Sequence, residues 1–343
     1  MKICLHIFFF LIYIGNNCLN AQQHAFRLMC YNVENYFDCI DDPLTHDEEF
    51  LPDGMRRWTY TRYKEKQTNI AKVIAHIGAW EPPAIVGLCE VESRKAMYDL
   101  VLRSPLKNLR YKFIHHESPD FRGIDVAMLY QSDIFQVLHD EAIAVKFKDA
   151  PHRTTRDILY VMGEIKAPKD TLHLFICHFP SRLGGEMESE SKRCDAAEIM
   201  RRKVDEIFEN YHNPNIVIMG DFNDYPDNKS ILNYIQAGYP REPCAHANLY
   251  NLMYPLHIAG KGTHKYQADW GVLDHLIVSG SLLDKSSSLF TDTTAVHIFD
   301  ADYLLQDDEK FLGKKPFRTY VGMKYIGGYS DHLPVYMDFF RKE

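Results

Sequence analysis

The 343-residue sequence has no apolar run long enough to cross a membrane, no excess of basic residues and no CxxC pair of cysteines. Its 18 glycines and 16 prolines are too few for a collagen-like chain, and 46% hydrophobic with 25% charged residues is typical of a globular protein rather than a disordered one. Without paired cysteine spacing, a cysteine-built zinc site is not expected. With 39 basic against 47 acidic side chains, the net charge of −8 excludes a protein that holds nucleic acid by bulk electrostatics, but permits brief contact with a polyanion.

The N-terminal segment has the pattern of an export signal. Lys2 precedes an apolar stretch that continues to Ile14 and is shorter than the ~20 residues of a membrane span. Ala21 is a small residue at a suitable cleavage position, so we predict that residues 1–21 are a signal peptide and that the protein is periplasmic or secreted. Lipoprotein anchoring through Cys18 is disfavoured, because Gly-Asn-Asn before it matches a lipid-attachment site poorly.

Export permits disulfides among the six cysteines that follow the cleavage position. Three of them stand just before a polar residue at a predicted strand end, and we expect buried thiols at Cys30, Cys89 and Cys177. Among the other three, the sequence permits a disulfide between Cys39 and either Cys194 or Cys244 and does not decide between them.

Short apolar runs rich in β-branched residues alternate with helical patterns along the chain. Thr61–Ile77 and Ser191–Phe208 carry apolar residues at helical spacing. This alternation predicts a single α/β domain in which helices cover the faces of sheets. The irregular polar segments Asp38–Trp58 and Asp300–Gly322 are predicted to be loops beside the site. The predicted strands are Arg27–Tyr31, Ala84–Cys89, Val126–Tyr130, Ile158–Ile165, Leu172–Cys177, Ile216–Met219, Leu273–Val278 and Leu333–Phe339.

Polar residues stand at the ends of six of these runs. Each has an ordinary interpretation alone, such as a turn asparagine or a surface acid. Strand ends present side chains from a rigid scaffold to one cleft, so the six together indicate a functional site. The residues are Asn32, Glu90, His178, Asp221 with Asn223, Asp274, and Asp331 with His332.

Seven motifs, six of which contain these residues, resemble those of the endonuclease/exonuclease/phosphatase superfamily. They are Cys-Tyr-Asn-Val-Glu-Asn from residue 30, Leu-Cys-Glu-Val-Glu from 88, Arg-Gly-Ile-Asp-Val-Ala from 122, His-Phe-Pro-Ser-Arg from 178, Gly-Asp-Phe-Asn-Asp from 220, Leu-Asp-His from 273 and Gly-Tyr-Ser-Asp-His-Leu-Pro-Val from 328. The resemblance spans roughly Phe26 to Phe340. It implies a four-layer α/β sandwich, with two packed mixed β-sheets flanked by helices, and a catalytic domain over residues 24–343.

The resemblance also implies a divalent-metal phosphoesterase site. Its expected metal ligands are Asn32, Glu90 and Asp331, which offer the oxygen donors that Mg²⁺ prefers, and Mn²⁺ is an alternative. Hydrolysis of a phosphate ester needs charge neutralisation, an oriented water and help for the leaving oxygen.

The remaining site residues divide these tasks. Asp221 is expected to orient and deprotonate the water, with Asn223 holding the phosphate or that water. His332 is expected to contact a phosphate oxygen as a cation whose tautomer Asp274 fixes. His178 matches a second histidine of the nuclease and sphingomyelinase branches, where it aids phosphate binding or the leaving group.

Further basic and aromatic residues are candidates for substrate binding. Arg122 and Arg182 are interpreted as a guanidinium clamp on phosphate, with ordinary surface arginines as the alternative. Asp125, in the motif of Arg122, is expected to support one of the arginines or His178. Trp270 is expected either to stack on a base or headgroup or to pack as core. The basic cluster of Arg56, Arg57, Arg62, Lys64, Lys66 and Lys72 is predicted to be mainly a solvated helix face.

These observations predict an exported, Mg²⁺-dependent hydrolase of phosphodiesters, most consistent with a nuclease acting on nucleic acid or nucleotides. We expect a monomer that forms no stable nucleic-acid complex and has no transmembrane segment after cleavage. One alternative is a sphingomyelinase-like or inositol-phosphate phosphoesterase. The second is a non-catalytic protein that binds a phosphate ligand on the same fold. An assay panel of nucleic acids, sphingomyelin and a chromogenic diester discriminates among them.

Overall fold

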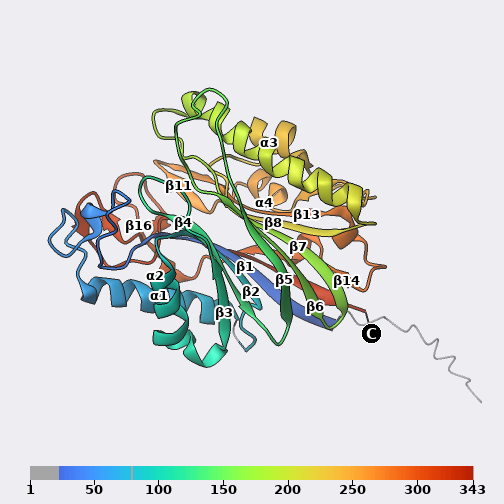
Figure 1. Cartoon of the computed structure of the whole chain (residues 1–343), viewed down its shortest axis with the longest axis horizontal. Helices are drawn as coiled ribbons and strands as arrows, with labels where there is room; N and C mark the ends of the chain where they lie inside the picture. Colours follow the sequence, from blue (N-terminus) through green and yellow to red (C-terminus); the bar gives the residue numbers. More distant parts are fainter. Residues whose placement is uncertain (1–22, 79, 343) are drawn as a thin grey trace, which may run out of the picture.

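The computed structural model describes residues 23–78 and 80–342 of the chain. Two large mixed β-sheets pack face to face, and helices cover their outer faces (Figure 1). This arrangement confirms the predicted four-layer α/β sandwich. The predicted signal peptide and Cys18 lie outside the described residues.

The first sheet, here called sheet A, is built around the long strand β1. Strand β1 pairs in parallel with β2 and antiparallel with β20, the last strand of the chain. The strand order is β14-β20-β1-β2-β4-β3, with β15 also paired to β20. The bounds are β1 Gln23–Tyr36, β2 Ile85–Val91, β3 Tyr111–His115, β4 Asp125–Gln131, β14 Leu289–Phe290, β15 Val296–Ile298 and β20 Val335–Arg341.

The second sheet, sheet B, has the order β5-β6-β7-β8-β13-β10-β9. Its central strands β7 and β8 run parallel, and β13 lies antiparallel beside β8. The bounds are β5 Phe135–Ile143, β6 Ile158–Lys166, β7 Lys169–His178, β8 Asn215–Asp221, β9 Ala237–Gly238, β10 Leu249–Asn251 and β13 Asp274–Ser279. Three two-stranded hairpins complete the strands: β11 His264–Tyr266 with β12 Asp269–Gly271, β16 Leu305–Asp307 with β17 Lys314–Pro316, and β18 Tyr320–Val321 with β19 Lys324–Tyr325.

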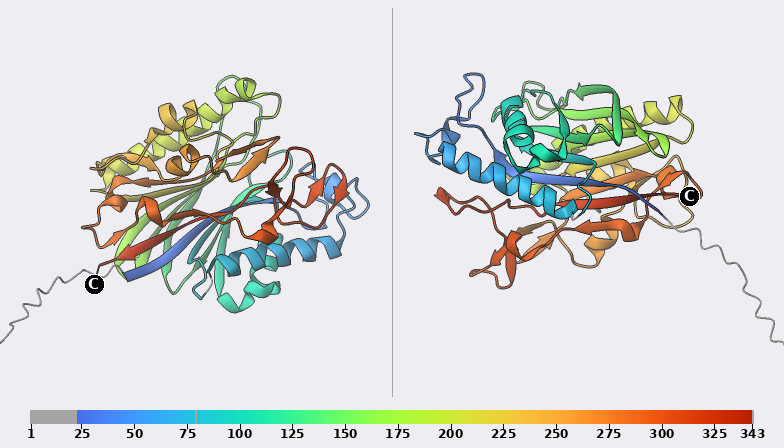
Figure 2. Two further views of the ribbon diagram at one scale, coloured as in Figure 1. Left: turned by 180° about the vertical axis from the view of Figure 1, so that it is seen from behind. Right: turned by 90° about the horizontal axis from the view of Figure 1, so that it is seen from below.

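The helices α1 and α2 lie on the outer face of sheet A, and α3 lies on that of sheet B (Figures 1 and 2). Their bounds are α1 Tyr60–Gly78, α2 Arg94–Arg103, α3 Glu186–Asn210 and the short α4 Tyr254–Ile258. Short 3-10 turns span Glu48–Phe50, Pro105–Leu109, Gly280–Leu283, Thr293–Ala295 and Asp302–Leu304, and a π-helical turn spans Ser230–Ile235. No helix among the described residues is long and apolar enough to cross a membrane.

Three apolar layers hold the sandwich together. Between the sheets, Leu28 and Met128 of sheet A pack with Ile176 and Met219 of sheet B, and all four side chains are fully buried. A second layer lies beneath α1 and α2, and a third beneath α3. Burial of apolar surface in these layers supplies the main driving force for folding. The site described below therefore stands on a scaffold with three packed interfaces.

The structure confirms every predicted strand and both predicted helices, with boundaries that shift by a few residues. It adds β3, β5 and α2, which the sequence patterns did not indicate. The segment Asp300–Gly322, predicted as a loop, contains the hairpin β16–β17. Cys30, Cys89 and Cys177 are buried thiols, as predicted. The other three cysteines of the described residues, Cys39, Cys194 and Cys244, are also free thiols. Neither disulfide that the sequence permitted is therefore present.

Candidate functional site

The polar residues predicted at the strand ends come together at one end of the sandwich. Asn32 is in β1 and Glu90 in the neighbouring β2 of sheet A. In sheet B, Asp221 ends β8, where it is opposite His178 of β7 on one side and Asp274 of β13 on the other. Facing strand ends from two sheets thus supply one cluster, which explains why residues far apart in sequence share a site.

The backbone of sheet A bends where it delivers its site residues. Pairing between β1 and β2 becomes irregular after Asn32, and the pairing of β2 with β4 shifts around Glu90. Glu34, Asn35 and Glu90 adopt φ values of 53°, 55° and 65°, which non-glycine residues rarely take. Such conformations concentrate at functional sites, where the surrounding structure stabilises them.

Asn32 connects the two sheets. Its Nδ2 donates to Asp221 Oδ2 at 2.9 Å and to Glu90 Oε1 at 3.3 Å, and its Oδ1 accepts from the Glu34 backbone amide. Asn35 N donates to the other oxygen of Glu90 at 2.8 Å. Glu90 Oε1 is therefore the oxygen of that carboxylate that faces the cluster.

His332 lies between two carboxylates of sheet B. Its Nδ1 is 2.7 Å from Asp274 Oδ2, and its Nε2 is 3.7 Å from Asp221 Oδ2. Burial alone would lower the pKa of His332, but Asp274 and Asp221 outweigh it and hold that pKa well above its ordinary value. The raised pKa favours the cationic form of His332. Burial, together with Asp274, raises the pKa of Asp221 to about 7.

Hydrogen bonds from three segments fix His332 and Asp274 in position. Ser330 Oγ donates to the Asn32 carbonyl at 2.7 Å and accepts from the His332 amide at 3.1 Å. Thr263 Oγ1 accepts from the backbone amides of Leu273 and Asp274. The imidazole and its carboxylate partner are therefore held by backbone contacts on both sides.

His178, unlike His332, is favoured in its neutral form. Burial lowers its pKa well below the ordinary value, and the positive charges of Arg156 and Arg122 lower it further. Its Nε2 lies 3.5 Å from Asp221 Oδ2, while its Nδ1 is buried without a hydrogen-bond partner among the described residues. Arg156 donates to the carbonyls of His178 and Phe179. A neutral and a cationic histidine thus flank Asp221.

Asn223 and Arg182 form one unit behind Asp221. The Asn223 amide donates to Asp221 Oδ1 at 2.9 Å, and its side chain donates to the Phe179 carbonyl. Arg182 donates to the Asn223 carbonyl at 2.7 Å, and its other nitrogens bond Glu186 and Asn228. All three nitrogens of Arg182 are bonded to protein, so the structure places it as a support for Asn223 rather than as a free phosphate clamp. Arg122, in contrast, has one ion-pair contact among the described residues, with Asp120 at 3.6 Å.

Asp331 belongs to an ionic network that the sequence did not indicate. Arg318 donates to Asp331 Oδ2 at 2.9 Å and to Glu34 Oε1 at 3.1 Å. Burial opposes ionisation of Asp331, but Arg318 and His332 hold its pKa below the ordinary value. Burial, followed by the charge of Asp331, raises the pKa of Glu34 to about 7.

Lys66 corrects the interpretation of the basic cluster on α1. It is 1% exposed, and its ammonium group donates to Thr319 Oγ1 and to the Tyr329 carbonyl. Helical spacing contained the signal, because Lys66 follows Tyr63 by three residues and precedes Ile70 by four, on the buried stripe. Burial lowers the pKa of Lys66 to about 8. It is therefore part of the support beneath the Ser330–His332 segment, not a solvated residue.

The acidic groups of the site fit a divalent cation. Glu90, Asp221, Glu34 and Asp331 are all buried or half-buried in one region, and two of them have pKa values raised to about 7. A raised carboxylate pKa marks negative charge that the surrounding protein does not fully compensate. Oxygen donors with excess negative charge are the environment that Mg²⁺ and Mn²⁺ select. Of the predicted ligands, Glu90 and Asp331 offer carboxylate oxygens, whereas Asn32 directs its Nδ2 toward Glu90 and Asp221 and its Oδ1 accepts from the Glu34 amide.

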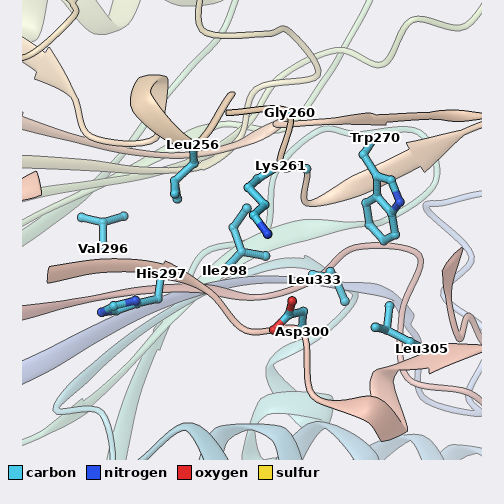
Figure 3. A pocket seen from close by; sticks show the side chains of 11 residues that line it. Leu256, Gly260, Lys261, Trp270, Val296, His297, Ile298, Asp300, Leu305 and Leu333 are labelled. Carbon is cyan, nitrogen blue, oxygen red and sulfur yellow. The ribbon is translucent and has the colours of Figure 1, made fainter. Parts of the chain in front are cut away.

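A cavity of about 440 Å³ lies apart from these residues, between β15 and the segment that links α4 to β11 (Figure 3). Lys261 and Asp300 direct their charged ends toward it, and Trp270 forms one wall. Trp270 also packs against the apolar layer of sheet A, in agreement with its core interpretation. None of the predicted catalytic or metal-binding residues lines this cavity, although Leu333, which does, directly follows His332.

Comparisons with known proteins agree with this architecture. The model of the Endonuclease/Exonuclease/phosphatase family matches residues 27–341. No curated protein sequence matches the chain.

Among solved structures, humanized D. rerio TDP2 is 15% identical, with a TM-score of 0.55, over 92% of this chain and 98% of that one. The human Nocturnin catalytic domain with bound sulfate is also 15% identical, with a TM-score of 0.55, over 92% and 94%. A mannosyl-6-phosphatase from Bacteroides thetaiotaomicron is 14% identical, with a TM-score of 0.56, over 92% and 99%. At these identities the similarity shows the shared fold.

Proposed function

The chain belongs to the endonuclease/exonuclease/phosphatase family of phosphoester hydrolases, and we propose that it is a divalent-metal-dependent phosphodiesterase acting on nucleic acid or nucleotides. The observation that carries the proposal is that the Nε2 atoms of His178 and His332 lie 3.5 Å and 3.7 Å from Asp221 Oδ2, one imidazole with a lowered pKa and the other with a raised pKa. A cation, a base and a neutral hydrogen-bonding group within one cluster correspond to the three tasks of phosphoester hydrolysis.

Substrate binding falls to the cationic groups. His332, held as a cation by Asp274, donates from Nε2 to a non-bridging phosphate oxygen. Arg122 supplies a second positive charge. Among the carboxylates of the described residues, its guanidinium has one ion-pair contact, the 3.6 Å contact with Asp120. Preorganised cations of this kind stabilise the charge that grows on the phosphoryl oxygens in the transition state.

Asp221 activates the water. Its Oδ1 is held by the Asn223 amide and its Oδ2 by Asn32, so the carboxylate cannot rotate away from the cluster. A pKa of about 7 makes it a competent proton acceptor near neutral pH. The cationic His332 beside it stabilises the ionised form, and the proton from the attacking water passes to Asp221.

His178 serves the leaving oxygen. Because its imidazole is neutral, it carries one N–H, which it donates to that oxygen or to the phosphate. Arg156 fixes the backbone of His178 and its positive charge disfavours protonation of the ring. Asn32, Glu90 and Asp331 would hold the divalent ion, which neutralises phosphate charge and polarises the phosphorus centre.

The decisive experiment is a hydrolysis panel on the mature protein. Plasmid DNA, RNA, sphingomyelin, bis-p-nitrophenyl phosphate and p-nitrophenyl phosphate are each incubated with Mg²⁺, Mn²⁺ or EDTA. The proposal expects cleavage of the diesters, preferentially nucleic acid, with Mg²⁺ or Mn²⁺ and none with EDTA. His332→Ala is the matched inactive control.

Other outcomes of the panel select other functions. Cleavage of sphingomyelin alone supports the lipid-headgroup alternative, and cleavage of the monoester alone supports a phosphatase. No cleavage of any substrate by a folded wild-type protein contradicts catalysis and leaves the phosphate-binding alternative. We also propose that the protein is exported and works as a monomer after removal of residues 1–21.

A further inference from the structure

A second cluster of metal-ligating side chains lies at the edge formed by β3 and β4, where Asp125 pairs with Val91, the residue after Glu90. His115 ends β3, Asp125 begins β4, and Glu117 follows β3 in the connecting loop. One ligand atom from each residue lies within 4.8 Å of those of the other two. The cluster contains none of the residues assigned above to catalysis or metal binding.

The two buried members of this cluster each have a polar atom without a hydrogen-bond partner in the described part of the chain. The side chains of His115 and Asp125 are 1% and 2% exposed. His115 Nε2 lies 3.1 Å from Asp125 Oδ2, yet no aligned hydrogen bond joins them, and neither atom has another partner among the described residues. Burying unpaired polar atoms is costly, so a ligand that both can bind would relieve the cost.

Asp125 is oriented toward His115 rather than toward the catalytic residues. Its Oδ1 accepts from both the backbone amide and the hydroxyl group of Ser118, which leaves Oδ2 to face the imidazole. The expected support of His178 or an arginine by Asp125 is therefore wrong, and Arg156 holds the His178 backbone instead. An outer partner that orients a carboxylate in this way is typical of metal sites.

The separation between the two atoms matches two ligands on one ion. Metal–nitrogen and metal–oxygen bonds of about 2.0–2.2 Å place neighbouring ligands roughly 3.0–3.5 Å apart. We propose that His115, Glu117 and Asp125 bind a transition-metal dication such as Zn²⁺ or Mn²⁺ at a structural site whose ligands are distinct from those of the phosphoester site. An imidazole ligand favours these ions over Mg²⁺ and Ca²⁺. Because the ligands of such a site are a histidine and two carboxylates, the absence of a CxxC pair does not argue against it.

The surroundings allow an ion to enter and to keep a water ligand. The Glu117 side chain is 64% exposed, so the site is open on one side. Asp125 also lines a cavity of about 10 Å³ that it shares with Asp157, whose Oδ1 is buried without a partner. This volume is about that of one water molecule by the same measure.

The ion would act on the loop that runs from residue 116 to 124. Asp120 of this loop bonds Arg156 at 3.0 Å, and Arg156 bonds the carbonyl of His178. Arg122 lies on the same loop. Fixing both ends of the loop with one ion would therefore hold Arg122 and the support of His178 in place, so His115, Glu117 and Asp125 are positioning residues.

Anomalous diffraction from crystals of the mature wild-type protein grown with Zn²⁺ tests the site directly. The proposal expects a zinc peak within bonding distance of His115 Nε2 and Asp125 Oδ2. A map that shows neither zinc nor any other ion there, at a Zn²⁺ concentration that occupies another site in the same crystal, overturns it. This readout does not depend on any variant being able to fold or on catalytic activity.

Zinc binding in solution gives a second, independent test. Calorimetry is done in a Glu90→Gln background, which weakens the catalytic metal site and isolates the second one. Adding Glu117→Gln or His115→Asn should weaken the remaining Zn²⁺ binding by at least ~10-fold, since even outer partners change affinity by ~10–100-fold. Asp140→Asn, which removes the partner of the neighbouring His116, is the matched control and should leave binding unchanged. Equal Zn²⁺ affinity in all these proteins contradicts the proposal.

Discussion

His332 Nδ1 and Asp274 Oδ2 lie 2.7 Å apart, although 58 residues separate them in sequence. Asp274 is 1% exposed, and within the described residues its one ion-pair partner is this imidazole, so the two groups form one charge unit beside Asp221. A buried pair of this kind loses most of its value when either partner is removed. The relationship leads directly to the first prediction.

His332→Ala should lower kcat/KM by ~10²–10⁴-fold, the usual scale for a positioned charge stabiliser or proton donor. Asp274→Asn should cost nearly as much, because the imidazole then loses both its orientation and its raised pKa. The double variant should be little worse than the worse single one, since groups that act as a unit are not additive. A double-mutant cycle with circular dichroism as the folding control measures this. Fully additive losses would show that the two residues act separately.

Glu90→Gln should remove most divalent-metal binding at the phosphoester site. The substitution neutralises the carboxylate whose Oε1 faces the cluster while keeping an acceptor for the Asn35 amide. Calorimetry with Mg²⁺ or Mn²⁺ should show binding to the wild type and strongly weakened binding to the variant. Unchanged affinity in Glu90→Gln would contradict the ligand assignment.

Asp221 should make stability depend on pH in the absence of metal. Its pKa is about 7 in the folded chain against an ordinary value of 3.8, so the folded state binds more protons between these values. Its contribution to stability is therefore fully present below pH 4 and is lost as pH rises through about 7. Melting temperatures in EDTA should fall less between pH 5 and pH 8 for Asp221→Asn than for the wild type. Equal changes for both proteins would contradict the raised pKa.

Arg122 and Arg182 should respond differently to substitution. Arg122→Ala should lower kcat/KM by ~10–100-fold through weaker substrate binding, the scale of one hydrogen bond to a charged group, and leave the melting temperature almost unchanged. Arg182→Ala removes bonds to Asn223, Glu186 and Asn228 and should lower the free energy of unfolding by about 1–3 kcal/mol. Steady-state kinetics and thermal denaturation of both variants distinguish the roles. If Arg182→Ala weakens substrate binding at full stability, Arg182 is the clamp instead.

Export predicts a mature N-terminus near Gln22. Mass spectrometry of the protein recovered from the periplasm or medium of the producing cells should show the loss of residues 1–21. An intact N-terminus in that fraction, or a wholly cytoplasmic protein, would contradict the signal peptide.

The sequence predicted the strands and the residues at their ends because both depend on local patterns. An apolar run followed by an acid, amide or histidine specifies where a strand stops and what it presents, and this located Asp221 and His178. The contacts of Arg318 were not predictable in this way. It lies between short hairpins, and its bonds to Glu34 and Asp331 depend on how distant segments pack. For the same reason the sequence did not reveal that Arg182 supports Asn223.

The first part of strand β1 pairs with the whole of β20, from Gln23 opposite Arg341 to Cys30 opposite Val335. The first and last strands of the fold are therefore neighbours at the centre of sheet A, and Asn32 and His332 come from these two ends of the chain. During synthesis, β1 has no antiparallel partner in sheet A until the segment containing β20 has been made. A growing chain thus cannot assemble the complete cluster before both His332 and β20 have been synthesised.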